Sequence, residues 1–408
     1  MNILIVSNYF CPSTTIAAYR IEAFAKYLKE AGHDITVVTE WDEENHIKWH
    51  GCDVHYVKNR IAQKAYLEKC RNLHKKWTLK RMANAILSRA LLDPSILSWN
   101  HWAYKKIVEL FKHKHFDVVL SSYPFLASHL LALKLRKNGY KFYWIADMRD
   151  EMSKFYFGPP FYRRRIRSYE HEILDSADVT VSVSAHLIKD FKATCDNGRF
   201  LEVKNGYDYD EIHDVTFQPQ FTMSYIGNLY KNLITPYNLF KAFNELMEER
   251  KIPSDSKIKI VGNTYIKLNV PDSIKDNVIQ IDRVSHSEAI RMSTETDVLV
   301  VIHQTGRKGV YTGKVFDYLA TNKPILALCD PNDVIAELLD ETKTGFTVDN
   351  DDIEGIKRSI LKCYSIWKNK EVLPRDWEKI KQYKRKNQIN ILADYLAAHK
   401  DEVESKKA

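Results

Sequence analysis

Cysteine is scarce in this sequence, and long hydrophobic runs are missing. The six cysteines form no CxxC pair, which argues against a disulfide framework or a cysteine-based zinc site and favours a reducing cytoplasm. No stretch of about 18 uninterrupted apolar residues occurs, so we expect no membrane-spanning helix. The start, MNILIVSNYF, lacks a basic segment and a small-residue cleavage site, so it predicts a strand and not a signal peptide.

Glycine-rich nucleotide motifs are also missing. The loop SNYFCPSTT, which follows the first predicted strand, lacks G-x-G-x-x-G, and this argues against a dinucleotide oxidoreductase. The TGK of residues 312–314 resembles part of a P-loop. However, Lys308 stands where the first glycine is required, and Val315 stands where a Ser or Thr is required. The Gly-Lys pair therefore needs another explanation.

The length and the order of apolar runs predict the fold class. A chain of 408 residues exceeds what one hydrophobic core usually supports, so two domains are expected. Apolar runs alternate with helix-length segments, which is typical of α/β domains with parallel sheets. We predict two Rossmann-like, doubly wound domains, 1–205 and 206–375, followed by a helical tail over 376–408 that packs across an existing surface. Strands are predicted at 2–7, 34–39, 117–122, 141–147, 179–184 and 200–206, then at 221–227, 257–262, 277–282, 297–302, 324–328 and 345–349, with helices at 16–31 and 237–249.

Positive charge is concentrated in the first half. The whole chain has a net charge of +8, yet residues 1–200 carry 31 Lys and Arg against 21 Asp and Glu. Arg163, Arg164 and Arg165 lie in the aromatic and basic run KFYFGPPFYRRRIR, and a second such run, LHKKWTLKRM, spans residues 73–82. These runs favour an anionic acceptor or an anionic membrane surface, and the alternative is a solvated face. No nucleic-acid reader fold is recognised, so nucleic acid is not an expected partner.

The stretch GVYTGKVFDYLATNKPILAL, residues 309–328, suggests a phosphate site. Gly313 and Lys314 would begin a helix, where backbone amides and an ammonium group favour phosphate oxygens. Asp317 follows one helical turn later, where its carboxylate would accept hydrogen bonds from ribose hydroxyls. The alternative is a local Lys–Asp pair on the surface of an ordinary helix.

Polar residues also follow strands in the first half. The sequence DMRD places Asp147, Arg149 and Asp150 at a strand end, the rim where α/β sheets bind ligands. In one interpretation, the two carboxylates bind sugar hydroxyls, and Arg149 contacts a leaving phosphate or supports the carboxylates. In the other, an internal Asp–Arg pair merely fixes the loop. Thr14 and Thr15, at the start of the first helix, would cap it or hold an anion. The D-x-D at 208–210 is interpreted as a hinge, so no metal site is expected.

The order of these segments resembles a retaining glycosyltransferase of family four, with the GT-B architecture of two facing Rossmann-like domains. The resemblance begins at ILIVSNYF, passes through YWIADMRDE, VKNGYD, YIGNLY and RVSHSEA, and ends at TNKPILAL. It extends over about 340 residues, and the DMRD segment is similar to a branch with D-x-R-D. The resemblance implies that the C-terminal helix crosses back to the first domain.

The resemblance also implies a donor site in the second domain. Gly227, Asn228 and Lys231 match residues that hold the donor diphosphate, and Val284 matches the segment near the nucleotide base. Asp317 matches the second acidic residue of the family's E-x7-E motif, whereas Gly309 stands in place of the first. The implied donor-binding residues are Gly227, Asn228, Lys231, Val284, Tyr311, Thr312, Gly313, Lys314 and Asp317. The implied catalytic residues are Asp147, Arg149 and Asp150, and the acceptor or membrane surface includes Thr14, Thr15, Arg163, Arg164 and Arg165.

The implied activity is transfer of a sugar, of the hexosyl type, from a nucleotide-sugar donor to an acceptor hydroxyl. The resemblance implies retention of the anomeric configuration without a metal or another cofactor. The implied acceptor is a glycan or a lipid-linked sugar in bacterial capsule, O-antigen or exopolysaccharide assembly. The protein would be cytoplasmic, or peripheral at the inner membrane. Two alternatives are a GT-B nucleotide-sugar epimerase and a non-catalytic nucleotide-sugar-binding protein, the second because Gly309 replaces an acidic residue.

Overall fold

The computed structural model describes residues 1–59, 94–124, 126–154, 160–195, 198–230, 233–304 and 306–406. The chain folds into two compact units. The first unit is Met1–Lys204 with Gln388–Ala408, and the second is Asn205–Asn387. The chain therefore leaves the first unit after Lys204 and returns to it at Gln388.

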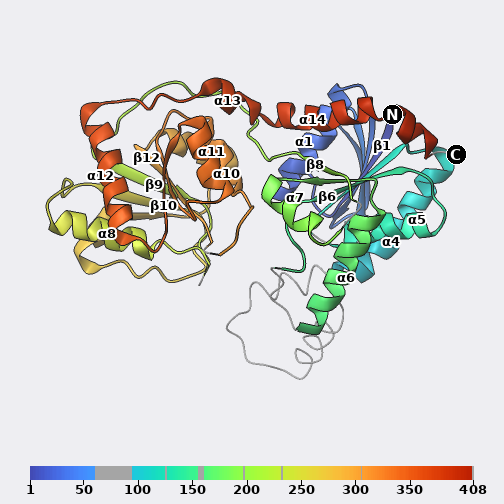
Figure 1. Ribbon diagram of the computed structural model, residues 1–408, viewed down its shortest axis with the longest axis horizontal. Helices are drawn as coiled ribbons and strands as arrows, with labels where there is room; N and C mark the ends of the chain where they lie inside the picture. Colours follow the sequence, from blue (N-terminus) through green and yellow to red (C-terminus); the bar gives the residue numbers. More distant parts are fainter. Residues whose placement is uncertain are drawn as a thin grey trace. The chain divides into compact units, whose positions relative to one another are not determined.

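A sheet of eight strands, counted over the described residues, forms the centre of the first unit (Figure 1). All neighbouring strands in it pair in parallel, except the antiparallel pair at one edge. Its continuous apolar runs are buried on both sides, as expected for parallel strands covered by helices. The strand order is β3 (Asn45–Trp49), β4 (Cys52–Lys58), β2 (Asp34–Trp41), β1 (Asn2–Ser7), β5 (Val118–Ser122), β6 (Tyr143–Met148), β7 (Val179–Ser182) and β8 (Phe200–Glu202).

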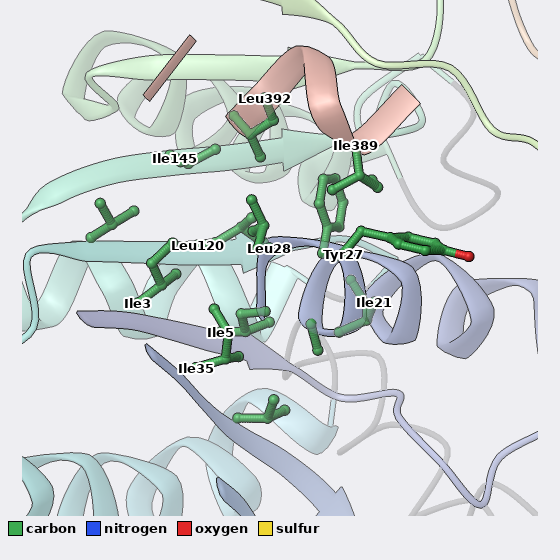
Figure 2. Close-up of a cluster of buried hydrophobic side chains, with 14 of the residues drawn as sticks. Ile3, Ile5, Ile21, Tyr27, Leu28, Ile35, Leu120, Ile145, Ile389 and Leu392 are labelled. Atoms are coloured by element: carbon green, nitrogen blue, oxygen red, sulfur yellow. The ribbon is translucent and has the colours of Figure 1, made fainter. Parts of the chain in front are cut away.

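Helices cover both faces of this sheet. On one face, Ile21 and Leu28 of α1 (Ile16–Glu30) pack with Leu392 of α14 (Arg385–Ala398) against Ile5 and Ile145 (Figure 2). This cluster is a hydrophobic core among the described residues of the unit, and its Ile389, Leu392 and Leu396 explain why the C-terminal helix belongs to the first unit. The other helices that the structure describes in this unit are α4 (Pro94–His113) and α5 (Leu126–Lys137), which contact the sheet, together with α6 (Pro160–Ser176), α7 (Ala185–Lys192) and α15 (Lys400–Ser405).

The second unit has a parallel sheet of six strands over its described residues. The strand order is β11 (Val278–Ile281), β10 (Lys257–Val261), β9 (Thr222–Ile226), β12 (Val298–Ile302), β13 (Ile325–Leu328) and β14 (Gly345–Val348). Two separate apolar clusters lie on its two faces. One includes α8 (Tyr237–Glu248) and α12 (Ile353–Asn369), and the other includes α10 (Gly313–Leu319), α11 (Val334–Thr342) and α13 (Trp377–Gln382). The 3-10 helix η1 (Asp272–Asn277) and the helix α9 (His286–Thr294) complete the unit.

The predicted α/β class with two doubly wound, Rossmann-like units is confirmed, as is the return of a C-terminal helix to the first unit. The predicted strands are present with shifts of one or a few residues. The pair β3 and β4 was not predicted, because its short strands mix polar and apolar residues. The tail is not one helix but α13, α14 and α15, with a break near Tyr383 and Lys384 where the chain bonds to Tyr207.

Candidate functional site

Lys314 lies at the start of α10, beside the carboxyl end of β9. A Cβ atom added to Gly227 would collide with the Lys314 ammonium nitrogen, so the two residues are in close contact and a side chain at position 227 would displace this ammonium group. The φ of 153° at Gly227 also favours glycine. The ammonium nitrogen lies 3.7 Å from the centroid of the Tyr225 ring, a cation–π contact. No carboxylate of the described residues pairs with it, and burial lowers the pKa of Lys314 to about 7. A half-buried ammonium group without a counter-charge makes Lys314 a candidate position for binding an anion.

Hydrogen bonds fix α10 against its neighbours. The Tyr318 hydroxyl accepts a hydrogen bond of 3.1 Å from the Ile226 amide, which is the residue before Gly227. Tyr209, in the segment after the first crossover, donates its hydroxyl to the Asp317 carbonyl. Arg375 is buried and donates to the carbonyls of Leu319 and Lys323 at the other end of the helix. These bonds hold Lys314 in place without using its side chain.

Two polar atoms near Lys314 have no hydrogen-bond partner among the described residues. One carboxylate oxygen of Asp317 pairs with His286 Nε2 at 3.1 Å, and the other is buried without a partner. The Thr312 hydroxyl precedes α10 but makes no capping hydrogen bond, and it is also buried without a partner. A buried polar atom without a partner costs free energy unless a ligand or water satisfies it. Asp317 is therefore not the partner of Lys314 in a surface pair.

Gly309, where the family's first acidic residue was expected, adopts a φ of 77°, which favours glycine. Its amide donates a 2.7 Å hydrogen bond to Asp333, whose carboxylate is almost completely buried before α11. An acidic side chain at position 309 would need this left-handed backbone. The backbone of this loop thus favours glycine at position 309, and the Asp333 carboxylate holds the loop by accepting the hydrogen bond of the Gly309 amide.

The other predicted donor residues have different environments. Asn228 is bonded on both sides of its amide, to the Tyr230 hydroxyl at 3.1 Å and to the Asn263 amide at 3.3 Å. Val284 is half-buried in the loop before α9. Tyr311 is buried against Phe316 in the core, with ring centroids 5.2 Å apart. Lys231 lies outside the residues that the structure describes.

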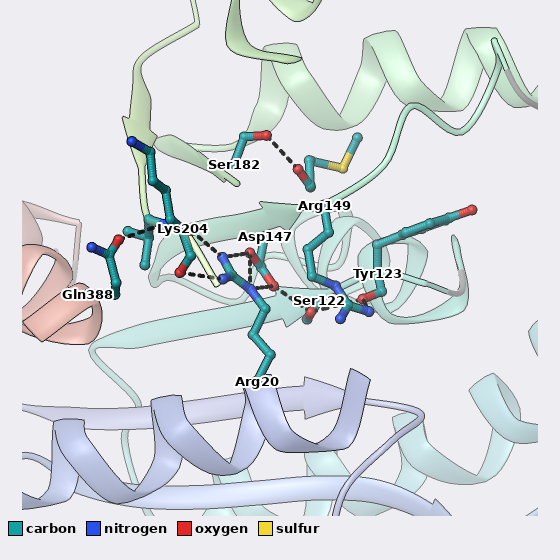
Figure 3. Close-up of polar contacts among 10 residues, drawn as sticks. Arg20, Ser122, Tyr123, Asp147, Arg149, Ser182, Lys204 and Gln388 are labelled. Atoms are coloured by element: carbon teal, nitrogen blue, oxygen red, sulfur yellow. Dashed lines mark hydrogen bonds and ion pairs between the residues drawn. The ribbon is translucent and has the colours of Figure 1, made fainter. Parts of the chain in front are cut away.

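Asp147 of the first unit is completely buried at the end of β6, and its ion-pair partner is Arg20 of α1 (Figure 3). Arg20 Nη2 lies 2.8 Å from Asp147 Oδ1, and the Ser122 hydroxyl donates to Oδ2 at 2.7 Å. Arg20 also donates to the carbonyls of Val203 and Lys204, at the crossover to the second unit. Burial alone would raise the pKa of Asp147, but the ion pair with Arg20 outweighs it, so the pKa lies below its ordinary value.

Arg149 and Asp150 differ from Asp147 in their exposure. The Arg149 guanidinium is buried and donates to the Tyr123 carbonyl (Figure 3), and burial lowers the pKa of Arg149. Asp150 is half-exposed on the same loop. The structure thus brings together Asp147, Arg20 and Ser122 as a closed network, whereas the side chain of Asp150 is only partly buried.

The remaining predicted residues lie on the surface of the first unit. Thr15 accepts a hydrogen bond from the Ala18 amide and caps α1, and Thr14 is exposed beside it. Arg163, Arg164 and Arg165 are exposed on α6. The second basic run, residues 73–82, lies outside the described residues.

Neither a metal cluster nor a membrane-spanning helix is found in the described part of the chain. It holds no group of three or more His, Cys, Asp or Glu side chains that would bind a metal ion. The two acidic residues of the D-x-D segment instead face cations, Asp208 near Arg385 at 4.0 Å and Asp210 near Lys384 at 3.5 Å. None of the described helices is long and apolar enough to cross a membrane.

Several residues of the site were not predicted from the sequence. Arg20 is 127 positions away from Asp147, and no local pattern links the two. His286 follows Ser285, which caps α9 by accepting from the Glu288 amide. That S-x-x-E capping box was visible in SHSE, and it would have placed His286 at a helix start.

Comparisons with known proteins concern the family and the fold. Residues 17–211 match the model of Glycosyltransferase Family 4. No curated protein sequence matches the chain. Three solved structures are similar over nearly their whole length. Sucrose-phosphate synthase from Thermosynechococcus elongatus has 12% identity and a TM-score of 0.61, covering 99% of this chain and 98% of that one.

The other two structures bear trehalose names. One is described as trehalose-6-phosphate from E. coli bound with UDP-2-fluoro glucose, with 11% identity, a TM-score of 0.60 and coverage of 100% and 99%. The other is an alpha,alpha-trehalose-phosphate synthase (UDP-forming) from Burkholderia xenovorans in complex with glucose-6-phosphate. It has 10% identity, a TM-score of 0.63 and coverage of 96% and 99%. At these identities the likeness shows the fold.

The chain has the GT-B fold of these structures, and residues 17–211 match a glycosyltransferase family model. The predicted resemblance to glycosyltransferase family four is confirmed, and the match covers most of the first unit and the crossover that follows it.

Proposed function

We propose that the protein transfers a sugar, of the hexosyl type, from a nucleotide-sugar donor to an acceptor hydroxyl with retention of the anomeric configuration. The observation that carries this proposal is the Lys314 ammonium group, which is half-buried, lies beside Gly227 and pairs with no carboxylate of the described residues. A diphosphate at this position would supply the missing negative charge.

In the proposed donor site, Lys314 binds the diphosphate and Asp317 accepts hydrogen bonds from the ribose. The free oxygen of Asp317 and the Thr312 hydroxyl are buried acceptors and donors that such a ligand would satisfy. Val284 would contact the base. Asn228 is already bonded on both sides, so we assign it to the shape of the loop and not to direct contact.

The proposed chemistry uses this positive charge on the leaving group. The bond between the anomeric carbon and the diphosphate oxygen breaks, the acceptor oxygen bonds to the same face of that carbon, and the acceptor proton passes to a phosphate oxygen. Lys314 would stabilise the charge that develops on the diphosphate, which is electrostatic catalysis by a preorganised group. We therefore propose that neither a metal ion nor another cofactor is required.

In the first unit, we propose that Asp150 contacts the acceptor and that Asp147 positions its loop. Asp147 is closed off by Arg20 and Ser122, whereas Asp150 is half-exposed two residues beyond β6. Arg149 would hold the same loop through Tyr123. A positioning role for Asp147 requires that its loss acts through the loop and the fold.

We propose a cytoplasmic protein in bacterial capsule, O-antigen or exopolysaccharide assembly, acting on a glycan or lipid-linked acceptor. The excess of basic residues in 1–200, with Arg163 and Arg164 exposed, supports an anionic acceptor or a peripheral contact with an anionic membrane. Solved structures of the same fold are named as sucrose-phosphate and trehalose-phosphate synthases, so a soluble sugar phosphate is the second candidate acceptor.

The test is incubation of the purified protein with UDP-, GDP-, ADP- and dTDP-sugars, followed by product analysis. Slow release of free nucleotide supports a transferase, a new nucleotide sugar supports an epimerase, and thermal stabilisation without turnover supports a binding protein. Lys314→Ala should abolish the stabilisation by the nucleotide. Lys308→Ala is the matched control, because Lys308 is nearby but paired with Asp330 at 2.7 Å. Equal effects of the two substitutions would contradict the assignment of the site.

A further inference from the structure

A pocket of about 500 Å³ lies within the first unit, apart from the donor residues described above. The loop after β6, the first half of α6 and the end of α7 form its walls. Residues that line it include Glu151, Lys154, Arg164, Arg167 and Asp190. We call it the arginine pocket.

Arg164 and Arg167 supply its positive charge. They lie three residues apart on α6, so their side chains share one face of the helix. Neither forms a hydrogen bond or an ion pair with any described residue. Arg163 behaves differently, since its guanidinium donates at 2.9 Å to the carbonyls of Ser153 and Lys154 and ties α6 to the loop. The pocket thus has two guanidinium groups available for a ligand and a third that holds its wall.

Acidic groups line the same pocket at a greater depth. Glu170 is buried and accepts hydrogen bonds of 2.9 Å from the Ser153 amide and hydroxyl. Glu151 is 7% exposed, and one of its oxygens accepts from Lys154 at 3.0 Å. Its other oxygen is buried and accepts no hydrogen bond from the described residues, although the carboxyl groups of Glu151 and Asp190 interact with each other. A ligand hydroxyl would satisfy this oxygen.

The two sets of groups suit a single ligand. Guanidinium pairs recognise phosphate oxygens, and carboxyl groups recognise sugar hydroxyls. We propose that the arginine pocket binds the phosphate group of a phosphorylated acceptor sugar, with Arg164 and Arg167 on the phosphate and Glu151 on a hydroxyl. This inference rests on the proposed function, because it assigns the ligand as the acceptor.

The position of the pocket along the chain supports the acceptor and not the donor. Glu151 directly follows Asp150, the residue assigned to the acceptor, on the loop after β6. All the lining residues belong to the first unit, whereas the donor residues belong to the second. The phosphate has two chemical sources, a soluble sugar phosphate and a lipid-linked sugar diphosphate.

The test measures binding to the full chain by calorimetry, without donor. The probes are inorganic pyrophosphate, glucose 6-phosphate and farnesyl diphosphate, with glucose and farnesol as unphosphorylated controls. We expect at least one phosphate probe to bind with a Kd below about 10 mM, and each of Arg164→Gln and Arg167→Gln to weaken it about tenfold, the loss of one charge-assisted contact. Arg165→Gln is the matched control, because Arg165 is exposed between them, lies over the Tyr169 ring and does not line the pocket.

The outcomes separate this inference from the proposed function. Tighter binding of glucose 6-phosphate indicates a soluble acceptor, and tighter binding of farnesyl diphosphate indicates a lipid-linked one. If no phosphate probe binds, or if all three arginine variants lose binding equally, the inference is wrong, even where nucleotides still bind in a Lys314-dependent way. If the phosphate probes bind through Arg164 and Arg167 but no nucleotide sugar is consumed, the proposed function fails and the anion pocket remains.

Discussion

Replacing Lys314 by Met should change both stability and nucleotide binding, in opposite directions. The substitution removes a half-buried ammonium group but keeps an unbranched apolar side chain beside Tyr225 and Gly227. Burial lowers the pKa of Lys314 to about 7 in the folded protein. Most substitutions in a core lower the unfolding free energy of a protein. Lys314→Met should not lower it at low pH, where the lysine is charged and half-buried.

The direction in which the unfolding free energy changes with pH follows from proton linkage. The unfolded chain has an ordinary lysine, so between pH 7 and about 10.5 it binds more protons than the folded protein, and stability rises with pH in this window. Between pH 6 and pH 9 the unfolding free energy of the unsubstituted protein should rise by roughly 1–3 kcal/mol relative to Lys314→Met, after allowance for solvent screening of a half-buried group. Denaturant unfolding at both pH values measures this difference.

The affinity for a nucleotide sugar should fall as the pH rises, whereas the unfolding free energy should rise. A diphosphate returns Lys314 to its charged form, so at pH 8 binding should take up about 0.9 protons if the free pKa is about 7. The diphosphate of a nucleotide sugar is a diester and does not titrate in this range. Affinity should therefore fall from pH 7.5 to pH 9, and Lys314→Met should bind about 10–100-fold more weakly at pH 7 with little pH dependence.

Calorimetry in two buffers of different ionisation enthalpy measures the proton uptake directly. Lys308→Met is the control, since Lys308 is exposed and paired with Asp330. If the affinity of Lys314→Met equals that of the control, or if the two proteins show the same pH slope, then Lys314 does not contact the diphosphate.

Four other substitutions and one treatment have defined outcomes. Asp317→Asn should weaken the binding of nucleoside diphosphates about tenfold but leave the binding of inorganic pyrophosphate unchanged, because only the ribose contact is lost. Equal losses of affinity for the two ligands in calorimetry would refute this. Asp147→Asn should lower the unfolding free energy by about 3–5 kcal/mol, because it leaves Arg20 buried without its ion pair, whereas Asp150→Asn should lower turnover with an unchanged melting temperature. Burial raises the pKa of Glu151 to about 7, so the folded protein disfavours its ionised form at any pH above the pKa of the unfolded chain. Glu151→Gln should therefore raise the unfolding free energy by up to about 3 kcal/mol at pH 8 and by about 1.4 kcal/mol at pH 5.5. An equal gain at both pH values argues against this cause. Removal of divalent metals with EDTA should leave turnover within about twofold, because Lys314 carries the leaving-group charge, and a complete loss restored by magnesium would show the opposite.

The fold was largely predictable because its strands carry the signal by themselves. Runs such as VVLSS and VLVVI are apolar on both faces, which is typical of strands buried in a parallel sheet. The antiparallel pair β3 and β4 was missed because NHIKW is short and exposed at alternate positions. The break in the C-terminal tail depends on long-range bonds between Tyr207 and the segment 383–385, which no local pattern encodes.

The candidate site was predictable only in part. The position of Lys314 at a helix start follows from the local sequence, but its contact with Gly227, 87 positions earlier, depends on how β9 and α10 pack. One of the two interpretations of DMRD paired an aspartate with the adjacent Arg149, but the ion-pair partner of Asp147 is Arg20 of α1, which lies far away in the sequence. Glu151 was not predicted as a site residue, because its carboxyl group has a raised pKa only through burial in the folded protein.

The central claim is that this protein transfers a sugar from a nucleotide-sugar donor held by Lys314. Incubation with the panel of nucleotide sugars tests it most directly, with 31P NMR to follow the nucleotide and 1H NMR to follow the anomeric proton of the released sugar. We predict that one donor is slowly split into free nucleoside diphosphate and sugar, that the released sugar first appears with the donor's anomeric configuration, and that Lys314→Met abolishes the reaction. Conversion of a donor into a different nucleotide sugar, or full activity of Lys314→Met, would contradict the claim.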